Sequence, residues 1–208
     1  MSDHHRPARY ATEWFDQFQG GTDPVERVRL ASDTAAALLS RVRADADPQV
    51  VERVLTLAKH DGIDTVTELW ADAVPHSLPG ALWRLHLIRA LVEQRPDECA
   101  LYYREGRARI DGIDVVVAGA AEPTGPDEVR AVAEEILRGA FIGDFALALD
   151  RAASFCRLTA RGAAHHADEH DALSAELAEE LTLRASRLAI IGNDLTACAA
   201  LWRDEALH

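Results

Sequence analysis

The chain has 208 residues, of which 48% are hydrophobic and 27% charged, and its formal net charge at pH 7 is −13. This length is enough to bury a sizeable core without disulfides, so we expect one domain over residues 1–208. The negative charge disfavours nucleic-acid partners, which need Lys and Arg gathered on one face, and no apolar run reaches the roughly 18 to 20 residues of a membrane span.

Helix start signals recur in the first third of the chain. Asp23-Pro24 and Asp47-Pro48 each combine a capping side chain with a first-turn proline, and Asp64 is a further candidate cap. An aromatic face precedes them at Tyr10, Trp14, Phe15 and Phe18. The helices expected here are 9–18, 24–43, 48–62 and 64–73.

The stretch Leu78–Gln94 has apolar residues on two opposite sides of a helix. Ser77 is its candidate cap, and Pro96 restricts the residue before it, so we expect a helix over residues 78–95. Two apolar faces require neighbours on two sides. The sequence therefore predicts that residues 78–95 form the central hydrophobic helix of the fold.

Helical periodicity continues to the end of the chain, with an interruption at Gly119–Pro126 that resembles a linker. We expect Asp144 to cap the helix that follows Gly139, and Gly162 and Gly192 to lie near helix ends. The expected helices are 96–105, 113–118, 126–139, 141–161, 168–192 and 195–206. The predicted fold is all-α, an orthogonal or up-down bundle of about eight or nine helices, with possible sub-bundles 9–118 and 126–208.

One polar seam interrupts the apolar surface of helix 78–95. His86, Arg89 and Glu93 follow one another at helical spacing, and Arg89 and Glu93 are placed to form an i, i+4 ion pair. We interpret the seam as an ion network, with a polar pocket for an acidic small molecule as the alternative.

A second polar group is the run His165-His166-Ala167-Asp168-Glu169-His170-Asp171. Its segment His166-x-x-Glu169-His170 resembles the zinc motif of the inverted-motif metallopeptidases, a resemblance that covers five residues. It implies that His166 and His170 ligate a metal and that Glu169 acts as the base. Those enzymes are larger and have a third glutamate ligand further downstream, whereas only Glu176, Glu179, Glu180 and Glu205 follow here.

The pair His166 and His170 is also similar to that of the DinB-like metal-binding bundles. That resemblance implies zinc or another divalent metal, with a third ligand from His60, His76 or His86. The competing interpretation is that these residues form a solvated connection and helix start after Gly162, and that the histidines have no metal-binding role. We favour this interpretation over a metal site.

The sequence shows no nucleophile elbow, phosphate-cradling loop or dinucleotide fingerprint. The widely spaced Cys99, Cys156 and Cys198 favour a reducing compartment, and the single lysine, Lys59, beside many arginines favours a bacterial source. We expect a non-catalytic cytoplasmic protein-interaction or regulatory module without a cofactor. Its expected partner is another protein or a second copy in a homodimer formed through the later helices. The alternative is a metal-dependent bundle enzyme using His166, Glu169 and His170.

Overall fold

The computed structural model describes residues 23–44, 69–109, 113–118, 125–171 and 174–208. These residues are helical with connecting turns and contain no strand, which confirms the all-α prediction for the described part of the chain. Among the described helices, none combines the length and apolar composition needed to span a membrane. The helices are α1 (Pro24–Ala44), α4 (Leu78–Gln94), α5 (Pro96–Ala108), α6 (Ile113–Ala118), α7 (Pro126–Ile142), α8 (Phe145–His170) and α9 (Ala175–Arg203).

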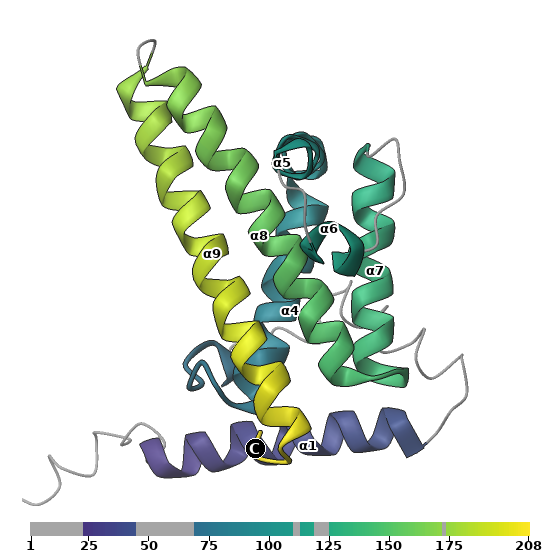
Figure 1. The fold of residues 1–208 in the computed structure, drawn as a ribbon. Helices are drawn as coiled ribbons and strands as arrows, with labels where there is room; N and C mark the ends of the chain where they lie inside the picture. Colours follow the sequence, from purple (N-terminus) through teal and green to yellow (C-terminus); the bar gives the residue numbers. More distant parts are fainter. Residues whose placement is uncertain (1–22, 45–68, 110–112, 119–124, 172–173) are drawn as a thin grey trace, which may run out of the picture.

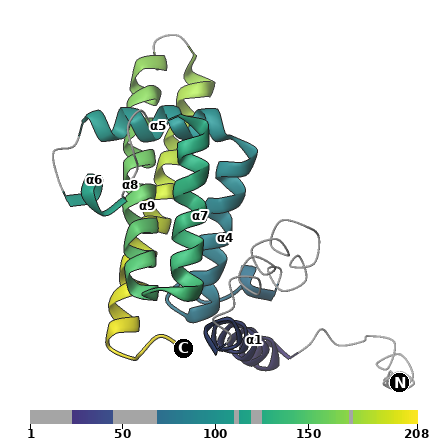
Figure 2. The ribbon, with the colours of Figure 1, turned by 90° about the vertical axis from the view of Figure 1, so that its right-hand side faces the viewer.

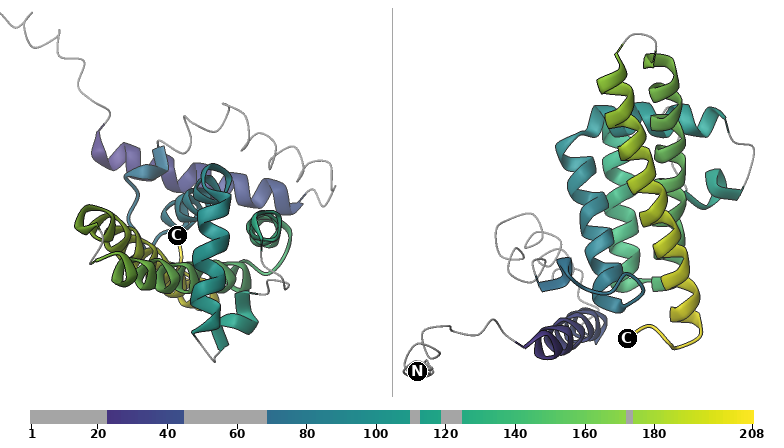
Figure 3. Two further views of the ribbon diagram at one scale, coloured as in Figure 1. Left: turned by 90° about the horizontal axis from the view of Figure 1, so that it is seen from above. Right: turned by 90° about the vertical axis from the view of Figure 1, so that its left-hand side faces the viewer.

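The long helices α8 and α9 pack against each other in antiparallel directions and form a hairpin (Figure 1). Helices α4 and α7 run alongside α8, whereas α5 crosses the bundle near the far end of the hairpin (Figure 2). Helix α1 lies across the opposite end, close to the C-terminal residues (Figure 3). The tip of the α8–α9 hairpin therefore projects beyond α5.

Helix α8 has more buried residues than any other described helix. It contacts α4, α5, α6, α7 and α9, and its buried residues include Phe145, Leu149, Phe155 and Leu158. Helix α4 also has neighbours around it, since it contacts α1, α5, α7, α8 and α9, and no residue from Leu78 to Val92 is exposed. The two apolar faces of α4 are thus covered, while α8 lies deeper in the core.

The predicted local signals are present at the start of several helices. The Ser77 hydroxyl accepts a hydrogen bond from the Gly80 backbone N–H at 3.2 Å, and the Asp144 carboxylate accepts one from the Leu147 N–H at 3.1 Å. Both side chains satisfy a first-turn donor that has no partner within the helix. The caps proposed for α4 and α8 from the sequence are confirmed.

Several predicted helix bounds were wrong, among them the starts at residues 168 and 195, which lie inside α8 and α9. Helix α7 continues past Gly139 to Ile142, α8 continues past Arg161 to His170, and α9 runs through Gly192 without a break. For α8 and α9, the physical reason is that Gly162 and Gly192 are needed for helix packing. A Cβ built on Gly192 would lie 3.1 Å from the Ala153 carbonyl oxygen of α8.

The closest packing in the bundle is the crossing of α5 and α8. A Cβ on Gly106 would lie 1.9 Å from the Leu158 carbonyl oxygen, and a Cβ on Gly162 would lie 1.8 Å from the Tyr102 carbonyl oxygen. These separations are far below van der Waals contact, and the opposing atoms are backbone. Only glycine allows the two helices to approach this closely at either position.

Two clusters of buried apolar residues hold the helices together. The main cluster draws on α1 and α4–α9, on both sides of residues 119–124. A small separate cluster lies near the hairpin tip and consists of Tyr102, Ala163, Ala167, Leu181 and Ala185. The predicted helices 9–18 and 48–62 lie outside the described residues, as do residues 119–124 of the predicted linker 119–126. Of the predicted helix 64–73, only residues 69–71 are described as helical.

Candidate functional site

The polar seam on α4 contains the predicted ion pair. The Arg89 guanidinium donates to one carboxylate oxygen of Glu93, from Nε at 2.9 Å and from Nη2 at 2.8 Å. Arg89 is only 4% exposed, and the His86 ring stacks on Trp83 with ring centroids 5.4 Å apart. The charge of Arg89 is therefore matched by Glu93, and a ligand pocket at His86, Arg89 and Glu93 stays a prediction.

The histidine run lies within the last turns of α8. The interpretation of this run as a solvated connection and helix start after Gly162 was therefore wrong. The helix spacing places Glu169 between two histidines: its Oε1 lies 3.1 Å from His165 Nε2 and its Oε2 lies 3.6 Å from His166 Nδ1. The His170 Nδ1 donates to the His166 carbonyl oxygen at 2.8 Å. These side chains thus make contacts within α8 itself.

Helix α5 supplies further charges to this end of the bundle. Arg109 contacts His165 and the Glu105 carboxylate, and the hydrogen bond from Arg109 holds the pKa of Glu105 below its usual value. The His166 ring packs against Tyr102 with centroids 5.4 Å apart, and His166 Nε2 is buried without a hydrogen bond. The crossing of α5 and α8 therefore joins the histidines to a network that the sequence did not predict.

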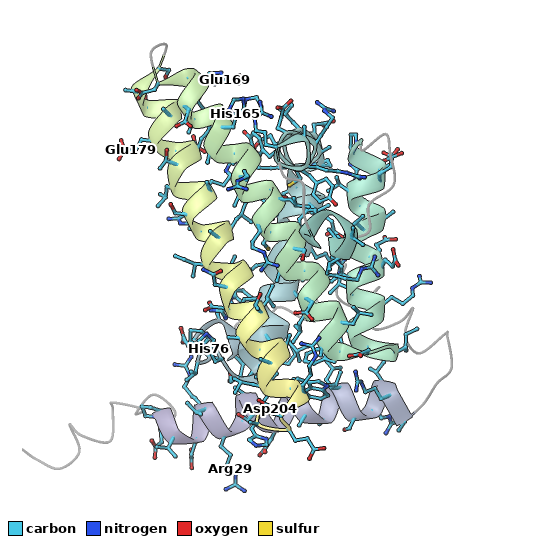
Figure 4. The ribbon with its side chains drawn as sticks, in the orientation of Figure 1. Arg29, His76, His165, Glu169, Glu179 and Asp204 are labelled. Atoms are coloured by element: carbon cyan, nitrogen blue, oxygen red, sulfur yellow. The ribbon has the colours of Figure 1, made fainter. Side chains whose placement is uncertain are left out.

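The predicted third metal ligand does not converge on this cluster within the described residues. His60 lies outside them, and His76 contacts Asp194 at 3.1 Å near the other end of the bundle, far from His165 and Glu169 (Figure 4). In the part of the chain that the structure describes, no group of three or more His, Cys, Asp or Glu side chains is arranged to hold a metal ion. Metal binding by His166, Glu169 and His170 stays a prediction.

The three cysteines provide no reactive thiol. All three are buried, and burial raises the pKa of Cys99 to about 11, of Cys156 to about 12 and of Cys198 to about 11. At neutral pH each thiol stays protonated, and the thiolate is the nucleophilic form. Cys156, which has no exposed surface, is a core residue of α8.

A feature that sequence reasoning missed is a groove between α8 and α9, with a volume of about 440 Å³. Alanines form most of its floor and two arginines stand on the α8 side. The lining residues are Arg157, Ala160, Arg161, Ala164, Ala185, Ser186 and Ala189. Small side chains at positions four apart on both helices leave room between them, which is why the surface is hollowed here.

Beside this groove, α9 exposes two large apolar side chains. Leu183 is 50% exposed and Ile190 is 59% exposed. They are seven positions apart in the sequence, so they lie on the same side of α9, next to Ser186 and two turns apart. We call the groove together with Leu183 and Ile190 the α8–α9 face. The seven-residue spacing was visible in the sequence, but the hollow beside it depends on the packing of two helices.

Comparison of the chain with protein-family models, with curated proteins and with solved structures found no significant match.

Proposed function

We propose that the protein is a non-catalytic cytoplasmic module for protein interaction or regulation, and that it forms a homodimer through the α8–α9 face. The observation that carries this proposal is the apolar ridge of Leu183 and Ile190 beside a groove floored by alanines. Large apolar side chains on a helix surface mark an interaction site when a complementary hollow lies next to them. The dimerising unit is the expected single domain, a bundle of eight or nine helices.

A two-fold arrangement makes this face complementary to itself. If the axis passes near α9 midway between Leu183 and Ile190, the two α9 helices run antiparallel, and each ridge meets the groove of the other copy. Apolar ridges packed between small residues give the close helix contacts typical of such interfaces. The pairing therefore buries on both copies the residues that a monomer leaves exposed.

Charge also supports this register. Glu179 projects from α9 away from α8 (Figure 4), and it lies about 11 Å along the helix from the proposed axis. On the other side of the axis, the Arg157 side chain extends along α9 from Gly192 to Thr196. Its Cγ lies 3.4 Å from a Cβ built on Gly192, and its Nη1 donates to the Thr196 hydroxyl at 2.9 Å. These two positions on α9 are about 8 and 14 Å from the axis, so Glu179 of one copy falls opposite Arg157 of the other.

Absence of catalysis is supported by the state of the reactive groups. The described cysteines are buried with raised pKa values, and the histidine run pairs with Glu169 and Arg109. The composition supports the bacterial and cytoplasmic parts of the proposal, as argued from the sequence.

Sedimentation or light scattering at micromolar concentration tests the homodimer. We expect a dimer for the natural chain and a monomer for the double variant Leu183→Glu, Ile190→Glu, because each copy would then have to bury two carboxylates against the alanines of the other copy's groove. The matched control is Leu147→Glu, which changes a side chain 52% exposed at the start of α8, away from the face, and leaves the dimer intact. A natural chain that is monomeric at these concentrations contradicts the proposal, as does a dimer that survives the double variant.

A further inference from the structure

A second groove lies at the opposite end of the bundle, between α1 and the C-terminal residues. Its volume is about 510 Å³, within the range of small-molecule sites in proteins. Most of the lining is apolar, from Ala36, Leu39, Leu78, Trp202 and Leu207. The polar lining residues are Ser32, Asp33, Ser40, Arg43 and His208.

Arg43 is held rigidly at one end of this groove. Its Nη2 donates to the carbonyl oxygens of Ala140 at 3.3 Å and Gly143 at 3.1 Å, at the C-terminal end of α7. Its guanidinium carbon lies 5.8 Å from the ring centroid of Phe145 and 5.4 Å from that of Trp202. A guanidinium fixed in this way presents its charge without the entropy cost of ordering a mobile side chain.

The hydrogen-bonding capacity of Arg43 is only partly used. Within the described part of the chain, Nη1 has no hydrogen-bond partner, and Nε is buried without one. Burial lowers the pKa of Arg43, and the negative charge of Asp144 acts against that shift. An anion reaching Nη1 from the groove would supply a hydrogen-bond acceptor for this atom and a further negative charge beside the guanidinium.

We infer that this groove binds a monocarboxylate with an apolar chain, whose carboxylate meets Arg43 and whose chain lies along Leu39, Leu78 and Trp202. A single negative charge fits better than a phosphate dianion because one guanidinium is present and Asp33 also lines the groove. From Arg43 to Ala36 the groove follows α1 for about 10 Å. An extended chain of nine carbon–carbon bonds covers about the same distance, which makes decanoate a suitable probe.

The test is isothermal titration of the full chain with decanoate, with decanol and decyltrimethylammonium as probes of equal chain length. We expect one decanoate per chain, weaker binding of decanol, and no binding of the cation. Arg43→Gln keeps a donor for the α7 carbonyls but removes the charge, and it should weaken decanoate binding about tenfold or more while leaving decanol unchanged. Arg41→Gln is the control, since Arg41 is exposed on the same helix and does not line the groove.

A second variant keeps the test decisive if Arg43→Gln does not fold. Ala36 is exposed and lines the groove, so Ala36→Trp fills the space without disturbing the core and should abolish decanoate binding. Absence of decanoate binding to the natural chain overturns the inference. So does binding that is equal for decanoate and decanol, or that persists in Ala36→Trp. None of these outcomes affects the homodimer, whose face lies on α8 and α9.

Discussion

The crossing of α5 and α8 gives the sharpest test of the packing. In Gly162→Ala, the new methyl carbon would lie 1.8 Å from the Tyr102 carbonyl oxygen, whereas a normal contact of this kind is about 3.3 Å. The helices must therefore separate by about 1.5 Å, because a backbone oxygen has no rotamer to change. Overpacking of this kind lowers the unfolding free energy by about 3 kcal/mol or more, and the better helix propensity of alanine offsets about 1 kcal/mol of this loss.

We expect Gly162→Ala to lose about 2 kcal/mol of unfolding free energy, which corresponds to a fall in Tm of about 4–8 °C for a chain of this size. Urea unfolding followed by circular dichroism measures it. Gly139→Ala is the matched control, since the new Cβ would lie at an ordinary contact distance of 3.5 Å from the Ala148 Cβ. The unfolding free energy of this variant should rise by up to about 1 kcal/mol. If both variants are stabilised alike, the close approach of α5 and α8 is refuted.

Two further predictions concern ion pairs and metals. Asp194→Asn should destabilise by about 2 kcal/mol in urea unfolding, because Arg84, only 12% exposed, loses the carboxylate that it contacts at 2.6 Å. Asp127→Asn, which removes an ion pair whose carboxylate is 90% exposed, should change stability by less than about 0.5 kcal/mol, and equal effects would contradict the argument from burial. Zinc titration of untagged protein should show no stoichiometric site at the histidine run, and a site abolished by His166→Ala would instead favour the metal-dependent alternative.

The caps of α4 and α8 were predictable from the sequence because the signals at these points are local, whereas the starts predicted at residues 168 and 195 lie inside longer helices. Ser77 and Asp144 accept hydrogen bonds from backbone groups three residues away, so their role depends little on the rest of the fold. The ion pair of Arg89 with Glu93 was predictable for the same reason. Spacing along one helix was sufficient in each case.

The role of the glycines was not predictable from local signals. A glycine is typical of a helix end, but Gly162 and Gly192 both lie inside helices. Glycine is needed at these positions because the backbone of a neighbouring helix passes close by. That contact joins residues far apart in the chain, so no local pattern reports it. The contact of Arg109 with His165 and the groove between α8 and α9 were missed for the same reason, since each depends on how two helices pack.

The small core cluster near the hairpin tip gives the bundle an uneven stability. The part of α8 and α9 beyond the crossing with α5 depends on a few residues, among them Tyr102, Ala167 and Leu181, which are not part of the main core. Opening this segment exposes little apolar surface, so its backbone amides exchange with solvent at a lower free energy than global unfolding requires. Ala185 belongs both to this cluster and to the α8–α9 face. In the proposed dimer, hydrogen exchange at the tip therefore slows as protein concentration rises.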